Sequence, residues 1–330
     1  MNLSTFFNSV VGMYLVQSFC HSVVAAMITD RALKAWRIFD PLVRQRFRLI
    51  VILFPIISFP CYQLINPARS SALFRLDSLF DMNRWLFLNI WGGTPLSVLL
   101  VFLFVLTSVV FLVQEMLPIL RHTLDSGLPE RDCPRLDAGP FIDEASRTLR
   151  IRKPEVFLVD DDNPVLFSTT GKDAVIYLST SLSEALTTEQ REAALAHELA
   201  HIARNRRPLL IAVFLLRIIM FFNPIALVKF RRAVRDEEKI CDDIAVSLTG
   251  NAAALAATLK LFHHKPDEAL SADPPKLATL NVSLEEYSHN LHLDDRIRRL
   301  ESGNTGRMKH WGLPFAMTLL TVAALNYFIV

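Results

Sequence analysis

Three long apolar runs constrain this chain more than any other feature of its sequence. They cover residues 4–28, 49–65 and 96–120, and each approaches the ~20 residues that a helix needs to cross the hydrocarbon core of a bilayer. A fourth apolar run covers residues 311–330. Hydrophobic residues make up 52% of the chain and its mean hydropathy is +0.31, whereas soluble domains have about 45–50% apolar residues. We therefore expect a mostly α-helical membrane protein with four transmembrane helices.

The first run is expected to stay in the mature chain as a helix. No basic segment precedes it, no small-residue cleavage site follows it, and it is longer than the core of a signal peptide. The run contains three polar residues, Asn8, Gln17 and His21. Polar side chains in membrane helices usually face other helices rather than lipid, so we expect these three to lie inside the bundle.

The distribution of Lys and Arg predicts the orientation of the chain. The loop at 29–48 carries six basic residues, Arg31, Lys34, Arg37, Arg44, Arg46 and Arg48. The loop at 66–94 carries three basic residues, Arg69, Arg75 and Arg84. It also contains two acidic residues, Asp77 and Asp81, which offset part of that charge. The positive-inside rule then places the first loop and the segment after residue 120 in the cytoplasm, and the N-terminus outside. Arg307 and Lys309, just before the last run, agree with this orientation.

Charge and cysteine content exclude two other classes of protein. The formal net charge of +2 is too small to indicate a nucleic-acid partner. The four cysteines, Cys20, Cys61, Cys133 and Cys241, are far apart and form no CxxC pair. Neither a disulfide framework nor a cysteine zinc site is indicated, and we expect reduced thiols.

Between the third and fourth apolar runs, the composition is that of a separate domain. Residues 121–140 are rich in Pro, Asp, Gly and Arg, as in a linker, and a short helix is expected at about 141–150. Turn signals then separate three expected strands, residues 155–161, 164–170 and 174–180. The expected division is an N-terminal transmembrane region at 1–120, a cytoplasmic α+β domain at 121–310 and a C-terminal transmembrane helix at 311–330.

The sequence HELAH lies in a predicted helix that follows these strands. Thr187 and Gln190 fit a capping box at its start. The run that follows contains no Gly or Pro and is rich in strong helix formers, so the helix should continue to about Arg207. His197 and His201 are four residues apart and therefore project from the same face.

Two imidazoles on one helix face can bind a single zinc ion. Glu198, directly after the first histidine, cannot comfortably bind the same ion, but its carboxylate can reach a water on it. Because zinc lowers the pKa of such a water toward neutrality and a carboxylate can accept its proton, the pattern indicates a zinc hydrolase. A core helix that happens to carry two histidines is the alternative, and a third ligand is needed to decide.

The stretch RDEEKICDDIAV, residues 235–246, offers that ligand. Glu238 and Asp242 are four residues apart on a helix-compatible segment and face the same way. Glu238 can complete a His₂Glu site for one zinc ion per chain, and Asp242 can hydrogen-bond a ligating histidine. A solvated charged helix would account for Asp236, Glu237 and Lys239, but less specifically for Glu238 and Asp242.

The apolar segment 208–230 separates the two ligand segments and cannot be a single membrane crossing. A crossing would put Glu238 on the opposite side of the bilayer from the histidines. Asn223 and Pro224 break the segment, and Arg217 lies in its middle. We expect a helical hairpin that dips into the membrane, with the active site at the cytoplasmic membrane surface.

These motifs together resemble a known family. HELAH, an apolar run ending in FFNPIALVKFRR, and then EEKICDD are similar to the integral-membrane gluzincin metallopeptidases of the β-lactam sensor-transducer (BlaR/MecR) type. A more distant resemblance links the chain to the heat-shock and prenyl-protein (HtpX/Ste) membrane metalloproteases. The resemblance covers roughly residues 95–300.

The resemblance implies a zinc endopeptidase in the bacterial cytoplasmic (inner) membrane. Its ligands would be His197, His201 and Glu238, with Glu198 as general base and acid and Asp242 supporting the site. In the broader clan, a sheet strand binds extended substrate, and strand 174–180 is either that edge or an ordinary core strand. A further basic group usually stabilises the oxyanion in such enzymes, and the candidates are His289, His292 and Arg296, which are otherwise surface residues of an amphipathic helix.

One departure from the family pattern affects the expected signal. Sensor-transducers carry a penicillin-binding domain with an SxxK motif after the last transmembrane helix, whereas this sequence ends at Val330. We therefore expect either a separate sensor protein or constitutive cleavage. Regulated cleavage of a cytoplasmic regulator is the first expectation, and quality control of membrane proteins is the second. A non-catalytic, zinc-stabilised signalling scaffold is the alternative from another class, and Glu198 argues against it.

Overall fold

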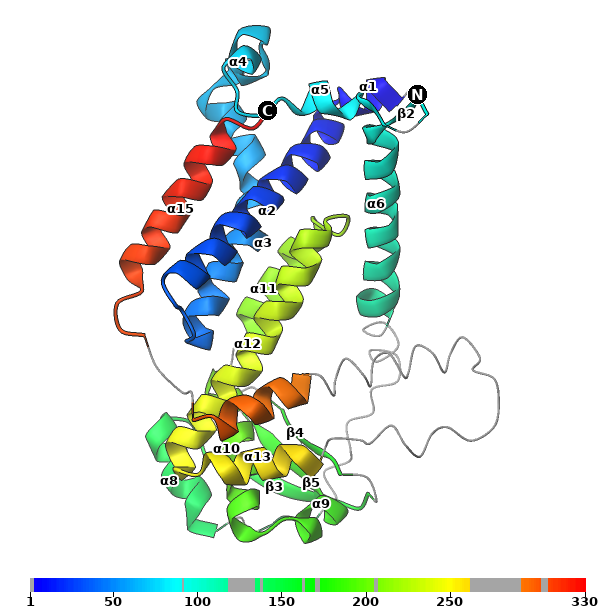
Figure 1. Cartoon of the computed structure of the whole chain (residues 1–330). Coiled ribbons are helices and arrows are strands. Elements are labelled where there is room, and N and C mark those ends of the chain that lie inside the picture. The colour runs from blue at the N-terminus through cyan, green and yellow to red at the C-terminus, as the bar shows by residue number, and fades with distance from the viewer. Residues whose placement is uncertain are drawn as a thin grey trace. The chain divides into compact units, whose positions relative to one another are not determined.

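The computed structural model describes residues 3–90, 92–117, 134–136, 139–161, 164–169, 173–204, 207–261, 292–303 and 308–330. These residues are mostly helical and belong to two compact units, whose elements Figure 1 labels. The helical unit comprises Met1–Ser126, Leu209–Asp236 and Arg307–Val330. The sheet-containing unit comprises Gly127–Pro208 and Glu237–Gly306.

The helical unit contains the helices that are long and apolar enough to cross a membrane. They are α2 (Val10–Ala35), α3 (Pro41–Ile65) and α6 (Leu96–Phe111), which continues as the π-helical turn η2 (Leu112–Met116). The protein is therefore a membrane protein. The fourth apolar run forms α15 (Gly312–Tyr327), which has 16 residues and falls short of the ~20 of a typical span. Four crossings remain a prediction.

Smaller elements complete this unit. They are α1 (Leu3–Phe7), η1 (Pro67–Ser70), α4 (Ala72–Leu76), α5 (Met82–Leu86), β1 (Asn89–Ile90) and β2 (Thr94–Pro95). The strands β1 and β2 pair as an antiparallel ribbon.

Two of the three polar residues of the first apolar run lie in the interior, as the sequence predicts. Gln17 accepts a hydrogen bond from the buried guanidinium of Arg69 at 3.1 Å. The His21 ring places Nδ1 2.7 Å from the hydroxyl of Ser58 on α3. The prediction is wrong for Asn8, which is exposed because α2 begins only at Val10.

The apolar segment 208–230 forms two helices, α11 (Arg207–Ile218) and α12 (Pro224–Thr249). The break lies where the sequence places Asn223 and Pro224. The Asn223 carboxamide oxygen accepts the backbone N–H of Ile225 at 3.0 Å and so caps the start of α12, and Pro224 suits the first helical position. The side-chain amide of Asn223 also donates to the hydroxyl of Ser22 on α2 at 2.8 Å.

Charged pairs tie the first half of α12 to the rest of the helical unit. Lys229 donates to Asp30 on α2 at 2.5 Å, and Asp236 forms an ion pair with Arg48 on α3. Arg48, Lys229 and Asp236 are all buried. Buried charges of this kind are tolerated when each has an opposite partner.

Arg217, whose side chain is 1% exposed, forms a further pair with Glu115. The Arg217 guanidinium lies 5.0 Å from the ring centre of Phe111 and 4.6 Å from that of Phe230, and it is ion-paired with Glu115 on η2. Glu115 also lies 3.3 Å from Arg231 on α12. The π-helical turn thus presents one carboxylate to cations on both α11 and α12.

The sheet-containing unit consists of a small sheet and surrounding helices. The strands β3 (Glu155–Val159), β5 (Val175–Ser179) and β4 (Leu166–Ser168) lie in the order β3-β5-β4, with β3 parallel and β4 antiparallel to β5. The helices are α8 (Gly139–Leu149), α9 (Thr180–Ala185), α10 (Thr188–Arg204), α13 (Ala252–Leu261) and a helix at 292–301. One core cluster joins α8, the sheet and α10 through Ile142, Ile176, Leu195 and Leu199.

The order of the strands corrects one expectation from the sequence. Residues 174–180 contain β5, which is hydrogen-bonded on both sides and so cannot be the edge that receives a substrate. The core-strand interpretation is right. The outer side of β3 is also occupied, because Leu136 and Leu158 donate to the carbonyls of Val156 and Pro134 at 2.9 Å each. Among the described residues of this sheet, β4 is the strand whose outer edge has no strand partner.

The predicted start of the HELAH helix is confirmed. The Thr187 hydroxyl accepts the backbone N–H of Gln190 at 3.3 Å, and the Gln190 side chain accepts that of Thr187 at 3.0 Å. Each side chain satisfies a backbone donor that the helix leaves unpaired. The helix α10 is described as far as Arg204, and residues 205 and 206 lie outside the described residues.

The buried pair of Glu115 and Arg217 should stabilise the helical unit. Glu115→Gln leaves the Arg217 charge, whose side chain is 1% exposed, without its anion, and breaking a buried pair in this way costs about 3–5 kcal/mol. We expect a lower thermal unfolding midpoint of the full chain in detergent. Adding Arg217→Met should recover most of the loss, because the charge is then removed as well.

Arg231→Gln is the matched control for this measurement. Its side chain is 37% exposed, so loss of its contact with Glu115 should change the midpoint little. A midpoint for Glu115→Gln equal to that of the wild type would contradict the stabilising role of the pair.

Candidate metal site

Small side chains allow the helix with both histidines to lie deep in its unit. Ala193, Ala196 and Ala200 have no exposed surface, so the neighbouring elements approach the α10 backbone closely. His197 and Glu198 are buried on the same helix at 8% exposure each. The site therefore lies on a helix held by packing.

A charged clamp holds α12 against α10. Arg204, near the end of α10, donates to both carboxylate oxygens of Glu237, with 2.8 Å between Nη2 and Oε2. Bidentate pairs of this kind fix direction as well as distance. The clamp places Glu238, the next residue on α12, beside the two histidines.

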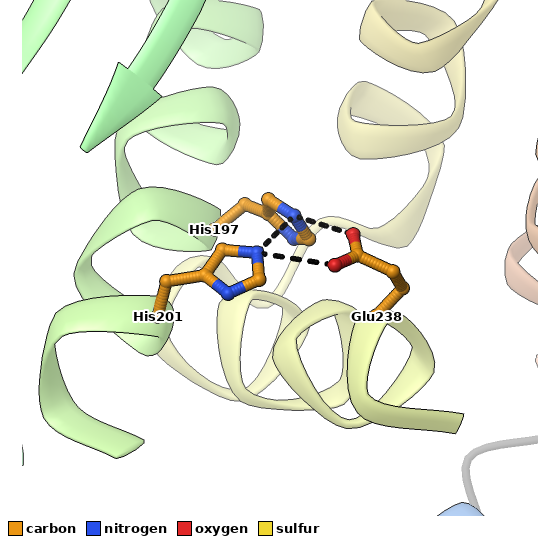
Figure 2. A group of neighbouring side chains, drawn as sticks. All are labelled: His197, His201 and Glu238. Carbon is orange, nitrogen blue, oxygen red and sulfur yellow. Dashed lines mark hydrogen bonds and ion pairs between the residues drawn. The ribbon is translucent and has the colours of Figure 1, made fainter. Parts of the chain in front are cut away.

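His197, His201 and Glu238 converge as a group that could hold a metal ion (Figure 2). The Nε2 atoms of the two histidines are 3.1 Å apart. The Glu238 oxygens lie 3.6 Å from Nε2 of His197 and 3.7 Å from Nε2 of His201. The structure thus brings together the three residues that the sequence predicts as ligands.

The spacing and chemistry of these atoms fit a zinc ion. Nitrogen and oxygen ligands about 2.0–2.2 Å from zinc in tetrahedral geometry lie about 3.4 Å from one another. The three observed separations, 3.1, 3.6 and 3.7 Å, lie close to that value. Two imidazoles and one carboxylate are also a donor set of catalytic zinc sites, which leave one position open.

Asp242 holds the far side of His197. Its Oδ1 atom lies 3.1 Å from Nδ1 of His197, so the ring turns Nε2 toward Glu238 and His201. Asp242 itself has no exposed surface. A carboxylate behind a ligating histidine orients the ring and raises its basicity.

The charges of the site favour the ionised forms of both carboxyl groups. Burial alone would raise the pKa of Glu238, but its hydrogen bond with His197 and the charges of His197 and Arg296 lower this pKa to about 2. The pKa of Asp242 is likewise held well below its usual range, because the Arg296 charge and the hydrogen bond with His197 outweigh its burial. Both groups are therefore carboxylates at neutral pH.

The two histidines respond in opposite directions. Burial disfavours the charged form of His197, but hydrogen bonds to Asp242 and Glu238 outweigh it and raise its pKa to about 9. Burial and the charge of His197 lower the pKa of His201. Without a metal ion, His197 is thus the imidazole that carries a proton at neutral pH.

Of the three candidates for an oxyanion-stabilising group, the structure brings Arg296 to the site. Its Nη1 atom lies 3.2 Å from Oε2 of Glu238, and its Nη2 atom 3.4 Å from Nε2 of His197. His292 lies about one turn earlier on the helix at 292–301. His289 lies outside the described residues.

Sequence analysis missed Cys241. Its Sγ atom lies 3.4 Å from Nδ1 of His201, so it contacts the second histidine much as Asp242 contacts the first. Burial raises the pKa of this thiol, which keeps it protonated. Its position three residues after Glu238, on the same helix face, was the available signal. Cys20, Cys61 and Cys241 are all free, as expected, and Cys133 lies outside the described residues.

Comparison with known proteins gives one match. The family described as BlaR1 peptidase M56 matches residues 89–254, half of the chain, and this range includes His197, Glu198, His201, Glu238 and Asp242. No curated protein and no solved structure matches the chain. The more distant resemblance to the heat-shock and prenyl-protein enzymes stays a prediction. Because the match covers half of the sequence, the chain belongs to the BlaR1 peptidase M56 family of membrane metallopeptidases.

Proposed function

We propose that the protein is a membrane zinc endopeptidase that hydrolyses peptide bonds of protein substrates. One observation carries this proposal: His197, His201 and Glu238 converge at zinc-ligand spacing, and Glu198 follows the first of them on a buried helix. Membership of a metallopeptidase family supports it. A scaffold that needs zinc only for folding has no use for a buried carboxylate at that position.

The metal would be held by Nε2 of both histidines and by the carboxylate of Glu238. Zinc in such a site polarises a water molecule and the substrate carbonyl, and lowers the pKa of the water toward neutrality. Asp242 would keep Nε2 of His197 directed at the ion, and Cys241 would contact the ring of His201 from behind. One zinc ion per chain is expected.

Glu198 would move the proton during the reaction. Its carboxylate takes the proton of the attacking water, and then delivers it to the nitrogen of the departing amine. Its position supports this role, because its negative charge acts on His201 and partly offsets the lowering of that histidine's pKa by burial and by the charge of His197. A base that is mostly buried is also shielded from competing solvent protons.

The edge of β4 is our candidate for binding substrate. In the three-stranded sheet, it is the edge left without a strand partner among the described residues, and β4 packs against the metal helix α10. An extended peptide could add to this edge through backbone hydrogen bonds. The side chains of β4 are half-buried and alternate between the two faces of the sheet: Leu166, Phe167 and Ser168. They would therefore lie beside the side chains of such a peptide on both faces.

The proposed setting is the bacterial cytoplasmic membrane. It comprises four crossings, a hairpin at 208–230 that dips into the bilayer, a cytoplasmic peptidase domain at 121–310, and an active site at the membrane surface. The excess of basic residues at 29–48 supports this orientation. Regulated cleavage of a cytoplasmic regulator is our first choice of role.

Glu198→Gln tests the catalytic assignment directly. The variant keeps the shape of the side chain but cannot accept a proton, so zinc content should stay near one per chain while cleavage falls by at least about 100-fold. Both quantities are measured on the full chain in membranes, with a generic unfolded protein as substrate. Undiminished cleavage with zinc bound would show that the assignment is wrong.

Two further variants complete this test. Glu238→Ala should lose zinc as well as activity, because it removes a ligand. Glu189→Gln is the matched control, since Glu189 is exposed in the first turn of the same helix and should affect neither quantity.

Zinc affinity should increase with pH up to about 9. The pKa of His197 is about 9 without the ion, so below that value zinc must displace a proton. Affinity should then rise about 10-fold per pH unit between 7 and 8.5 and level off above 9. Competition titrations with a chelator across this range measure it, and calorimetry should detect one released proton at pH 7.5. An affinity that is equal at pH 7 and 8.5 would contradict the raised pKa.

Reporter fusions test the orientation. A reporter fused after residue 130 should be active on the cytoplasmic side, and one fused after residue 80 on the outer side, because the basic loop at 29–48 stays inside. An outer-side signal after residue 130 would overturn the proposed location of the active site.

A further inference from the structure

Three residues of the helix at 292–301 form ion pairs with the second half of α12, all within the sheet-containing unit. Asp295 pairs with Lys239, Arg296 with Asp242 and also with Glu238, and Arg299 with Asp243. The partners on each helix are spaced so that they lie along one face. The pairs form a ladder that attaches this helix to the metal-site helix.

The ion pairs between these two helices differ in burial. Asp295 is 60% exposed, so the first pair is screened by solvent and contributes little. Asp242, in the second pair, is 1% exposed. Arg299 and Asp243, in the third, are mostly buried, and Arg299 contacts Asp243 and the backbone carbonyl of Lys239. The second and third pairs therefore link the same two helices, and they differ in the other residues that each arginine contacts.

Arg296 uses its whole guanidinium group inside the metal site. Nε and Nη2 donate to the two oxygens of Asp242 at 2.8 and 2.7 Å. Nη1 lies 3.2 Å from Oε2 of Glu238. Arg299, by contrast, directs both terminal nitrogens at the single carboxylate of Asp243, at 2.7 Å each. One arginine thus spans two carboxylates, and the other spans one.

The two carboxylates that Arg296 spans are those that set the geometry of the ligands. Glu238 is the expected third ligand, and Oδ1 of Asp242 is shared between Nη2 of Arg296 and Nδ1 of His197. The planar guanidinium fixes the plane of the Asp242 carboxylate, and this plane sets the direction of the His197 ring. It also separates two negative charges that lie one turn apart on α12.

The same contacts leave Arg296 poorly placed to stabilise an oxyanion. All three of its nitrogens already face carboxylates, Nε and Nη2 the buried Asp242 and Nη1 Glu238, so a substrate oxygen would have to compete with one of these contacts. A buried carboxylate that loses a bidentate cation partner is strongly disfavoured. We propose that Arg296 is a positioning residue that holds Glu238 and Asp242, and through Asp242 the ring of His197, in the arrangement that binds the metal.

This inference rests on the proposed zinc site and adds a residue to it. Without the guanidinium, the repulsion between Glu238 and Asp242 is no longer offset, and the Asp242 carboxylate loses the two hydrogen bonds that fix its plane. Loss of an outer partner of a metal ligand typically weakens metal binding by about 10–100-fold. Removing Arg299 breaks a neighbouring link between the same helices but leaves both carboxylates in place.

The test compares Arg296→Met with Arg299→Met in the full chain in detergent. Zinc affinity is measured by competition with a chelator, and the unfolding midpoint is measured on zinc-free protein. We expect both variants to lower the midpoint to a similar degree. Arg296→Met should weaken zinc binding by about 10-fold or more, and Arg299→Met should leave it near the wild-type value.

Arg296→Lys separates charge from geometry. Lysine keeps the positive charge but cannot span two carboxylates, so it should restore the unfolding midpoint more fully than the zinc affinity. If Arg296→Met does not fold, Arg296→Lys decides the question, and wild-type zinc affinity in that variant overturns the proposal.

Two other outcomes also overturn it. Equal loss of zinc affinity in Arg296→Met and Arg299→Met would mean that attachment of the helix, and not Arg296 itself, shapes the site. Unchanged zinc affinity with lost cleavage in Arg296→Met would mean that Arg296 acts on the substrate. Failure of the proposed zinc site is seen separately, because Glu238→Ala would then keep its metal.

Discussion

The bidentate pair between Arg204 and Glu237 is the interaction on which the candidate site depends. The two histidines on α10 supply two of the expected ligands, and the third must come from another helix at the correct position along α10. The pair of Arg204 and Glu237 fixes that position, because Glu238 follows Glu237 directly on α12. Asp242 and Cys241 then fall beside the two imidazole rings as a result of helix periodicity alone.

Much of the site could be predicted because its residues repeat with the period of a helix. His197 with His201, and Glu238 with Asp242, are each four residues apart, so their shared faces follow from the sequence. The capping residues Thr187 and Gln190 were equally visible, because the contact is local. The convergence of the two helices was inferred from zinc chemistry, since no local pattern specifies it.

The parts that sequence analysis missed depend on contacts between distant segments. Turn signals between β-rich runs identified residues 174–180 as a strand, but they say nothing about which strands lie on either side, and β5 proved central. Arg296 was recognised as a basic candidate near the site, yet its two carboxylate partners lie 54 and 58 residues earlier in the chain. Arg217 was likewise visible as a charge in an apolar run, whereas its partner Glu115 was not.

Six of the seven residues at 237–243 in α12 have a defined side-chain partner. Glu237 contacts Arg204, Glu238 the histidines, Lys239 contacts Asp295, Cys241 contacts His201, Asp242 contacts His197, and Asp243 contacts Arg299. Each residue of a helix is turned by about 100° from the one before it. Insertion or deletion of one residue here would therefore misalign every later contact at once. Variation in this enzyme should accordingly take the form of substitution in α12 and change of length elsewhere.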